Sequence, residues 1–209
     1  MAKVASFEKH ASRYEAWFVE HAAVYESELE AIRVLLPAGG RGVEIGVGTG
    51  RFAVPLGIAV GIEPAEAMGM AARARGVKVI GGVAEALPLA EAQFDTVLMV
   101  TTLCFLDDVA ASFREAHRVL KPGGCLVIGF IDRNSPLGKT YEREKEGSVF
   151  YREAHFYSVD EVVSLLRAAG FEDFAFVQTL FHPVAAIVAP EPIRSGYGEG
   201  SFVVVRGRK

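Results

Sequence analysis

The segment VEIGVGTGRF, residues 43–52, constrains the fold of this chain more than any other stretch. It puts Glu44 inside an apolar run and follows it with Gly46, Gly48 and Gly50. Because glycine has no Cβ, a strand that enters such a loop and continues into a helix lets backbone N–H groups approach a ligand closely. The ligand expected at such a loop is a nucleotide or a relative of one. The same spacing is also compatible with a tight turn that has no ligand.

Two acidic residues accompany the loop. A carboxylate in a buried strand costs free energy unless it is paired or hydrogen-bonded, so we expect Glu44 to fix the loop or to meet an ammonium group. Glu63 ends the run VGIEP, roughly 20 residues after the loop begins, where an acid can accept hydrogen bonds from both hydroxyls of a ribose. The alternative for Glu63 is an acid at a helix N-terminus, since Pro64 can open the next helix.

Short β-rich runs alternate with helical patterns, which predicts a parallel sheet covered by helices on both faces. Apolar residues at helical spacing between Tyr14 and Leu36 predict one or two helices before the sheet. The expected strands are 42–47, 59–63, 77–81, 94–101, 124–131, 171–181 and 202–206. The expected helices are 51–57, 65–75, 109–120 and one after Ser158, whose spacing to Glu161 is that of a capping box.

Composition narrows the functional classes. A chain of 209 residues, 51% of them hydrophobic, can bury one continuous core, so we expect a single domain over residues 1–209. No apolar run approaches the roughly 20 residues that cross a bilayer, so we expect a cytoplasmic protein without a membrane span. A net charge of −4 without a basic block argues against a nucleic-acid partner. Cys104 and Cys125 lack the spacing of a zinc site, so we expect no metal.

Four motifs, in order along residues 42–130, resemble those of class I S-adenosylmethionine-dependent methyltransferases. The resemblance is to the small-molecule branch that includes the quinone-biosynthesis C-methyltransferases. The motifs are the loop VEIGVGTGRFA, the strand end GIEP, the adenine-side segment GVAEALPLAEAQFDTVLMV and the closing segment SFREAHRVLKPGGCLVIGF. The resemblance implies a Rossmann-like methyltransferase fold, an α/β architecture with a doubly wound, mostly parallel seven-stranded sheet and an antiparallel C-terminal strand.

The resemblance also implies S-adenosylmethionine as the cofactor and gives the loop residues roles toward it. Gly46, Gly48 and Gly50 would pass beneath the methionine part of the cofactor. Glu44 would help to hold the amino end of the methionine part, and Glu63 would bind the ribose.

Further cofactor contacts follow from the later motifs. Ala84 and Glu85 would border adenine, and Pro64 directly follows the ribose-binding residue. Thr101, at the end of the fourth expected strand, would face the cofactor. Val83 departs from the family, which often has an Asp there to accept a hydrogen bond from the adenine amino group. Either Glu85 or a backbone carbonyl replaces that acceptor, or adenine binds more weakly; we favour a replacement, because Leu87 and Pro88 keep the usual frame of the loop.

The methyl acceptor is not named by any residue, and O-, N-, C- and S-methylation all stay open. We expect a small, apolar or planar molecule, because a nucleic-acid substrate would need basic tracks. Its pocket is expected between an N-terminal helical cover (1–36), a lid insertion (132–157) and the connection 182–201, which should bring Tyr197 close to the same edge of the sheet. Tyr14 or Trp17 could lie against the cofactor, since an aromatic face suits a sulfonium cation.

Catalysis and the competing functions remain open from sequence alone, as does the oligomeric state. If the acceptor must lose a proton, His155 is the first candidate for a base, although it also fits an ordinary surface histidine. A nicotinamide-dependent oxidoreductase would share the strand, loop and helix, but its fingerprint has the third Gly or Ala one place after Gly50 and no acid at Glu44. A non-catalytic S-adenosylmethionine-binding sensor would keep the same loop and Glu63.

Overall fold

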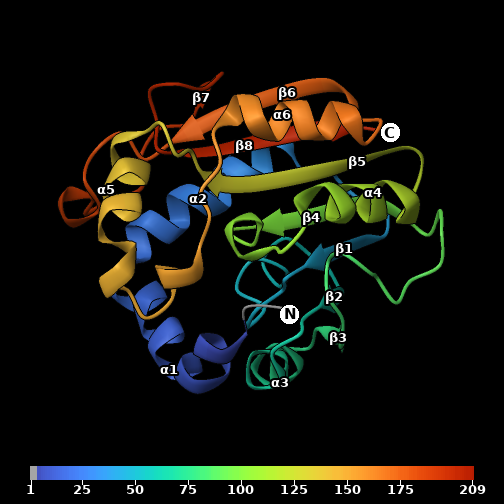
Figure 1. The fold of residues 1–209 in the computed structure, drawn as a ribbon, viewed down its shortest axis with the longest axis horizontal. Helices are drawn as coiled ribbons and strands as arrows, with labels where there is room; N and C mark the ends of the chain where they lie inside the picture. Colours follow the sequence, from blue (N-terminus) through green and yellow to red (C-terminus); the bar gives the residue numbers. More distant parts are fainter. Residues whose placement is uncertain (1–3) are drawn as a thin grey trace.

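The computed structural model describes residues 4–209 (Figure 1). The helices are α1 (Ala5–Glu20), α2 (Ala22–Leu35), α3 (Glu66–Ala74), α4 (Val109–Val119), α5 (Pro136–Glu144) and α6 (Val159–Ala168). The strands are β1 (Gly42–Ile45), β2 (Val60–Ile62), β3 (Lys78–Ile80), β4 (Phe94–Val100), β5 (Leu120–Ile131), β6 (Glu172–Thr179), β7 (Arg194–Ser195) and β8 (Phe202–Arg208). Four 3-10 turns add η1 (Leu103–Phe105), η2 (Lys145–Gly147), η3 (Tyr151–Glu153) and η4 (Val184–Ala186). No helix within residues 4–209 combines the length and the apolar character needed to cross a bilayer.

The described strands form one sheet in the order β3-β2-β1-β4-β5-β8-β6-β7. The first five of these strands pair in parallel, and β8 runs antiparallel between β5 and β6. This confirms the predicted doubly wound, mostly parallel sheet with an antiparallel C-terminal strand. The expected count of seven strands is one too low, because residues 194 and 195 pair with β6 as the short edge strand β7.

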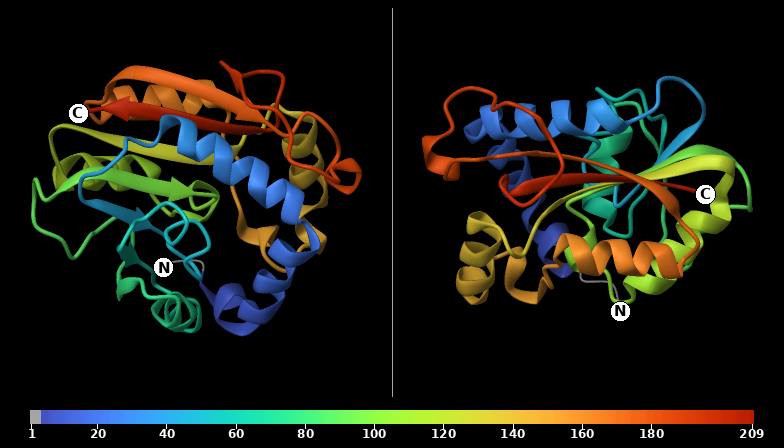
Figure 2. Two further views of the ribbon diagram at one scale, coloured as in Figure 1. Left: turned by 180° about the vertical axis from the view of Figure 1, so that it is seen from behind. Right: turned by 90° about the horizontal axis from the view of Figure 1, so that it is seen from above.

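Helices cover both faces of the sheet, as Figure 2 shows in the view from above. On one face α2 packs against β5, β6 and β8, and the fully buried Ile32 and Phe202 belong to this side of the core. On the other face α4 and α6 pack together, with Phe113 and Leu166 fully buried. The helix after Ser158 is confirmed as α6 and has the predicted capping box.

The expected helix at 51–57 is wrong, because these residues form successive turns. Gly50 has a φ of +81° and Gly57 a φ of +72°, so left-handed glycines end the segment on both sides. Pro55 also lacks a backbone N–H. Too few residues remain between the two glycines for a regular helix to propagate.

The helix α1 is fixed beside the glycine loop by two of its acidic residues. Glu15 accepts hydrogen bonds from Thr49 Oγ1 and from the guanidinium groups of Arg51 and Arg75. Glu8 accepts from the first backbone N–H groups of α3, at residues 66 and 67. Figure 1 shows α1 and α5 at the edge of the sheet toward which the arrows of β4 and β5 point. Residues 1–3 of the expected cover 1–36 lie outside the described residues.

Candidate active site

The glycine loop lies where β1 ends, and backbone hydrogen bonds from β2 hold its first half. The N–H groups of Gly46 and Val47 donate to Ile62 O at 2.8 and 3.0 Å. Gly46 has a φ of +70° and Gly48 a φ of +54°, a region that disfavours side chains. A Cβ on Gly46 would also collide with the Thr102 side chain. The loop therefore requires glycine here for backbone shape and for close approach.

Glu63, at the end of β2, ties that strand to the loop. Its Oε2 accepts from Gly48 N at 2.8 Å, and its Oε1 accepts from Ala65 N at 2.9 Å. Burial raises the pKa of the Glu63 carboxyl, while the two backbone N–H donors oppose that shift. Each carboxylate oxygen keeps acceptor capacity beyond its single backbone donor. Glu63 thus both shapes the loop and presents oxygens to the cavity beside it.

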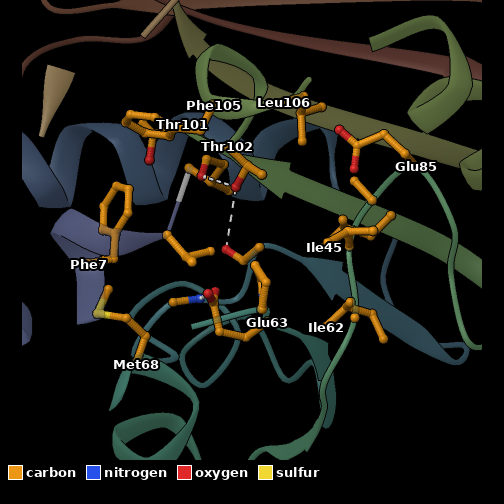
Figure 3. A pocket seen from close by; sticks show the side chains of 18 of the residues that line it. Phe7, Ile45, Ile62, Glu63, Met68, Glu85, Thr101, Thr102, Phe105 and Leu106 are labelled. Carbon is orange, nitrogen blue, oxygen red and sulfur yellow. Dashed lines mark hydrogen bonds between the residues drawn. The ribbon is translucent and has the colours of Figure 1, made fainter. Parts of the chain in front are cut away.

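A cavity at the carboxyl ends of β1, β2 and β4 gathers most of the residues that the sequence assigned to the cofactor (Figure 3). The assigned residues that line it are Tyr14, Gly46, Gly48, Glu63, Pro64, Ala84, Glu85 and Thr101. The lining residues that sequence reasoning did not name include Val4, Phe7, Thr102, Phe105 and Leu106. We call this space the cofactor cavity.

Glu44 and Gly50 do not line the cofactor cavity but support its floor. Glu44 is 1% exposed, and its Oε2 has no hydrogen-bond partner in the described chain. Burial raises the pKa of this carboxyl well above its usual value, although a hydrogen bond from the backbone N–H of Ala53 opposes the shift. At Gly50 an added Cβ would press on Val77 and Ala72, so this glycine allows the loop to pack closely on α3.

Glu85 and Val83 form the adenine-side segment expected from sequence. Glu85 lines the cofactor cavity, and its Oε1 accepts from the backbone N–H groups of Asp107 and Asp108 at 2.9 and 3.3 Å. Val83 pairs with Ala86 in an isolated bridge and also lines the cavity. The Glu85 carboxyl is therefore held at the cavity wall by the segment that leads into α4.

The end of β4 adds two threonines. Thr101 has a φ of +49°, which is rare for a β-branched residue and typical of strained functional sites. Thr102 Oγ1 donates to Val100 O at 3.1 Å and lies 3.4 Å from Gly46 O, so it joins β4 to the glycine loop. In Figure 3, Thr102 and Glu63 face each other across the cavity. Thr102 could have been recognised in the sequence, because the pair of threonines directly follows a buried strand.

A second, larger cavity of about 670 Å³ adjoins the first. It shares four residues with the cofactor cavity, namely Phe7, Tyr14, Thr101 and Phe105. The rest of its wall comes from α1, α2, α5, the turns η2 and η3, and residues 52, 131, 148, 150, 180 and 184. All three segments that the sequence assigned to an acceptor pocket therefore contribute to this wall. We call it the acceptor cavity.

Two residues named from sequence lie elsewhere. His155 is exposed, its ring packs edge-on against Tyr157, and it lines neither cavity, so the structure does not bring the candidate base to the site. Tyr197 was expected near the carboxyl edge but is 44% exposed and bonded to Asp160 on α6. Ala154 and Phe156, on either side of His155 in the sequence, are buried, whereas His155 is exposed.

Comparisons with known proteins agree with this geometry. Residues 43–128 match the family model described as a methyltransferase domain. A crystal structure of a Thermotoga maritima SAM-dependent methyltransferase, named as a "possible histamine N-methyltransferase", has a TM-score of 0.95 and 54% sequence identity over 98% of each chain. An uncharacterised protein of Methanocaldococcus jannaschii is 43% identical over 97% of this chain and 98% of its own length.

A relative of named activity extends the match. The malonyl-[acyl-carrier protein] O-methyltransferase of Geobacter sulfurreducens is 31% identical over 97% of this chain and 83% of its own length. The glycine loop, the acid at the end of β2 and the sheet order agree with these matches. The chain therefore belongs to the S-adenosylmethionine-dependent methyltransferases.

Proposed function

We propose that this enzyme transfers a methyl group from S-adenosylmethionine to a small, mainly apolar or planar molecule bound in the acceptor cavity. The observation that carries the proposal is the junction of the two cavities at Phe7, Tyr14, Thr101 and Phe105. Aromatic and aliphatic side chains together make up most of the wall beyond this junction, as a site for an apolar ring requires. An acceptor there would lie next to the cofactor without an intervening protein layer.

Three features support S-adenosylmethionine in the cofactor cavity. Glu63 offers carboxylate oxygens to a ribose, and the glycine loop leaves backbone room along the cavity floor. The unpartnered Oε2 of Glu44 is a buried acceptor beneath the cavity floor that suits an ammonium group held through water. When bound, the cofactor supplies a methyl group activated by its sulfonium sulfur.

The protein's own task is to position the acceptor and to exclude water. Tyr14 serves both cavities, and its hydroxyl lies over Gly48, 3.5 Å from where a Cβ would stand. Residues 4–36 and 132–157 form a cover that closes the acceptor cavity on its solvent side. Tyr14 and Phe7 in this cover also place aromatic faces where a sulfonium is stabilised.

The acceptor atom stays open at this level. The Thermotoga relative is named for methylation of nitrogen, and the Geobacter relative for methylation of oxygen. Neither a nicotinamide-dependent oxidoreductase nor a non-catalytic sensor is favoured by any of the matches. The net charge of −4 and the aromatic wall both support a small-molecule acceptor over a nucleic acid.

The test is to incubate the purified protein with methyl-labelled S-adenosylmethionine and a metabolite extract. We expect label in a small-molecule fraction, and loss of most transfer in Glu63→Ala. Glu91→Ala, which removes an exposed acid away from both cavities, serves as the matched control. Label that appears only in RNA or protein would overturn the proposed acceptor class.

A further inference from the structure

We propose that the methyl acceptor is an amine, and that Glu28 in the wall of the acceptor cavity recognises its nitrogen and takes a proton from it. This inference rests on the proposed function, because it assigns the substrate class of the same cavity.

Glu28 is a buried carboxyl without a protein partner. It lies on α2, is 5% exposed and lines the acceptor cavity. Within residues 4–209, the Glu28 carboxyl has neither a hydrogen bond nor an ion pair. Its neighbour Ser27 is fully satisfied by comparison, since its hydroxyl donates to Ala23 O and accepts from Glu191 N. A buried carboxyl without a partner is costly, so Glu28 fits a role in which the ligand supplies the partner.

Three tyrosines of the same cavity wall offer hydroxyl oxygens and no cation to Glu28. Burial, with a contribution from the charge of Glu28, raises the pKa of Tyr14, of Tyr141 to about 12, and of Tyr151. The hydroxyls of these tyrosines come from α1, α5 and η3 and form no hydrogen bond in the described chain. The remaining charged residues of the cavity wall, none of them bonded to Glu28, are Arg13, Glu20, Glu144 and Lys145.

Aromatic rings complete a site that suits a cation. Trp17, Phe18, Phe52 and Phe150 belong to the same wall. Ring faces attract an ammonium group, and a desolvated carboxylate completes its neutralisation. An alcohol, a thiol or a carbon acid brings no positive charge to balance Glu28. The combination of one buried carboxyl, three tyrosine hydroxyls and several aromatic rings therefore selects a basic nitrogen on an apolar body.

The same carboxyl can prepare the nitrogen for reaction. A protonated amine has no free lone pair, so one N–H proton must leave before the nitrogen can accept a methyl group. That proton moves to a Glu28 carboxylate oxygen, which leaves an uncharged amine beside a neutral carboxylic acid. Burial raises the pKa of Glu28 to about 8, so its carboxylate form is a stronger base than an ordinary carboxylate and becomes the main form above about pH 8.

Trp17 supplies a direct readout of this cavity, because it is the one tryptophan of the sequence and lies in the cavity wall. We would titrate the protein, saturated with S-adenosylhomocysteine, with phenethylamine and with its neutral analogue phenethyl alcohol. Binding is followed by Trp17 fluorescence and by calorimetry. In the wild-type protein we expect the amine to bind at least about tenfold more tightly than the alcohol.

The variant Glu28→Gln keeps the shape of the side chain and removes its charge. We expect it to lose most of the preference for the amine while its affinity for the alcohol and for S-adenosylhomocysteine stays unchanged. Glu26→Gln removes an exposed charge from the same helix and should keep the preference.

Several results would overturn the inference. These are equal wild-type affinities for the two probes, no response to either probe, or an unchanged preference in Glu28→Gln. The wild-type comparison needs no variant, so it stands even if Glu28→Gln folds poorly. Failure to bind S-adenosylhomocysteine would instead overturn the proposed function, and the two failures are therefore distinguishable.

Discussion

Two buried carboxyl groups, Glu44 and Glu28, and the partly buried Glu63 lie around the two cavities, and they accept different numbers of hydrogen bonds. Glu63 accepts two backbone N–H donors, Glu44 accepts one, and Glu28 accepts none within the described chain. Of the three, Glu28 combines an unpaired carboxyl with a place in the wall of the acceptor cavity, and that combination is the basis of the proposed amine site.

The titration of Glu28 also makes the free energy of unfolding depend on pH. Its pKa is raised from 4.5 to about 8 in the folded protein by burial, so the folded state binds the proton more tightly than the unfolded state. The stabilisation from this proton is complete when the pH lies below the ordinary pKa of a glutamate, and it is lost as pH rises through about 8. Relative to Glu28→Gln, the wild-type free energy of unfolding should fall by about 1.4 kcal/mol per pH unit in that window.

Urea unfolding of both proteins between about pH 5 and 8 checks this slope. Glu44, Glu63 and the tyrosines near Glu28 titrate in both proteins, so the difference between wild type and variant isolates Glu28. Glu26→Gln should give a flat difference over the same range. A flat difference for Glu28→Gln as well would mean that Glu28 titrates normally.

At the level of elements, we expect ligand binding to stabilise α1 and the segment 132–157. The contacts of α1 with the loop and α3 pass mainly through Glu15 and Glu8, at its polar face. Few of its side chains are buried, and Phe18 is the fully buried one. A segment with few buried contacts opens locally at low cost.

We expect S-adenosylhomocysteine to slow amide hydrogen exchange in residues 4–25 and 132–157, as well as in the glycine loop. Glu15→Gln should speed exchange in α1 in the free protein, because it weakens the ion pairs to Arg51 and Arg75. Exchange in α4, which packs on the far face of the sheet, serves as the internal reference. Protection limited to residues 46–85 would show that neither segment closes over the site.

Some elements could be read from sequence and others could not, for physical reasons. The helix α6 was predictable because Ser158 and Glu161 form a local capping box. The turns at 51–57 could not be predicted, because the pattern of hydrophobic residues does not show which glycines adopt a positive φ. Tyr141 reads as part of a charged, solvated helix, yet its ring lines the acceptor cavity through tertiary packing of α5.

For the whole molecule, the parallel half of the sheet and the cofactor cavity followed from sequence because the motifs sit at consecutive strand ends. Parallel topology then brings those ends together at one edge. The acceptor cavity did not follow in the same way. Its wall joins residues from α1, α2 and α5, and Glu28 stands among exposed acids, Glu26 and Glu30, that resemble it in sequence. Only the packing of the folded chain distinguishes the buried Glu28 from the exposed Glu26 and Glu30.

The central claim is that the cavity beside the glycine loop and Glu63 binds S-adenosylmethionine. Isothermal titration calorimetry with S-adenosylmethionine, S-adenosylhomocysteine and NADH tests it most directly. We predict one site for both sulfur compounds and none for NADH. We also predict that Glu63→Ala weakens binding by about 1.5–3 kcal/mol through the lost charge-assisted hydrogen bonds, while Glu91→Ala binds normally. Binding of NADH without either sulfur compound, or unchanged affinity in Glu63→Ala, would contradict the account.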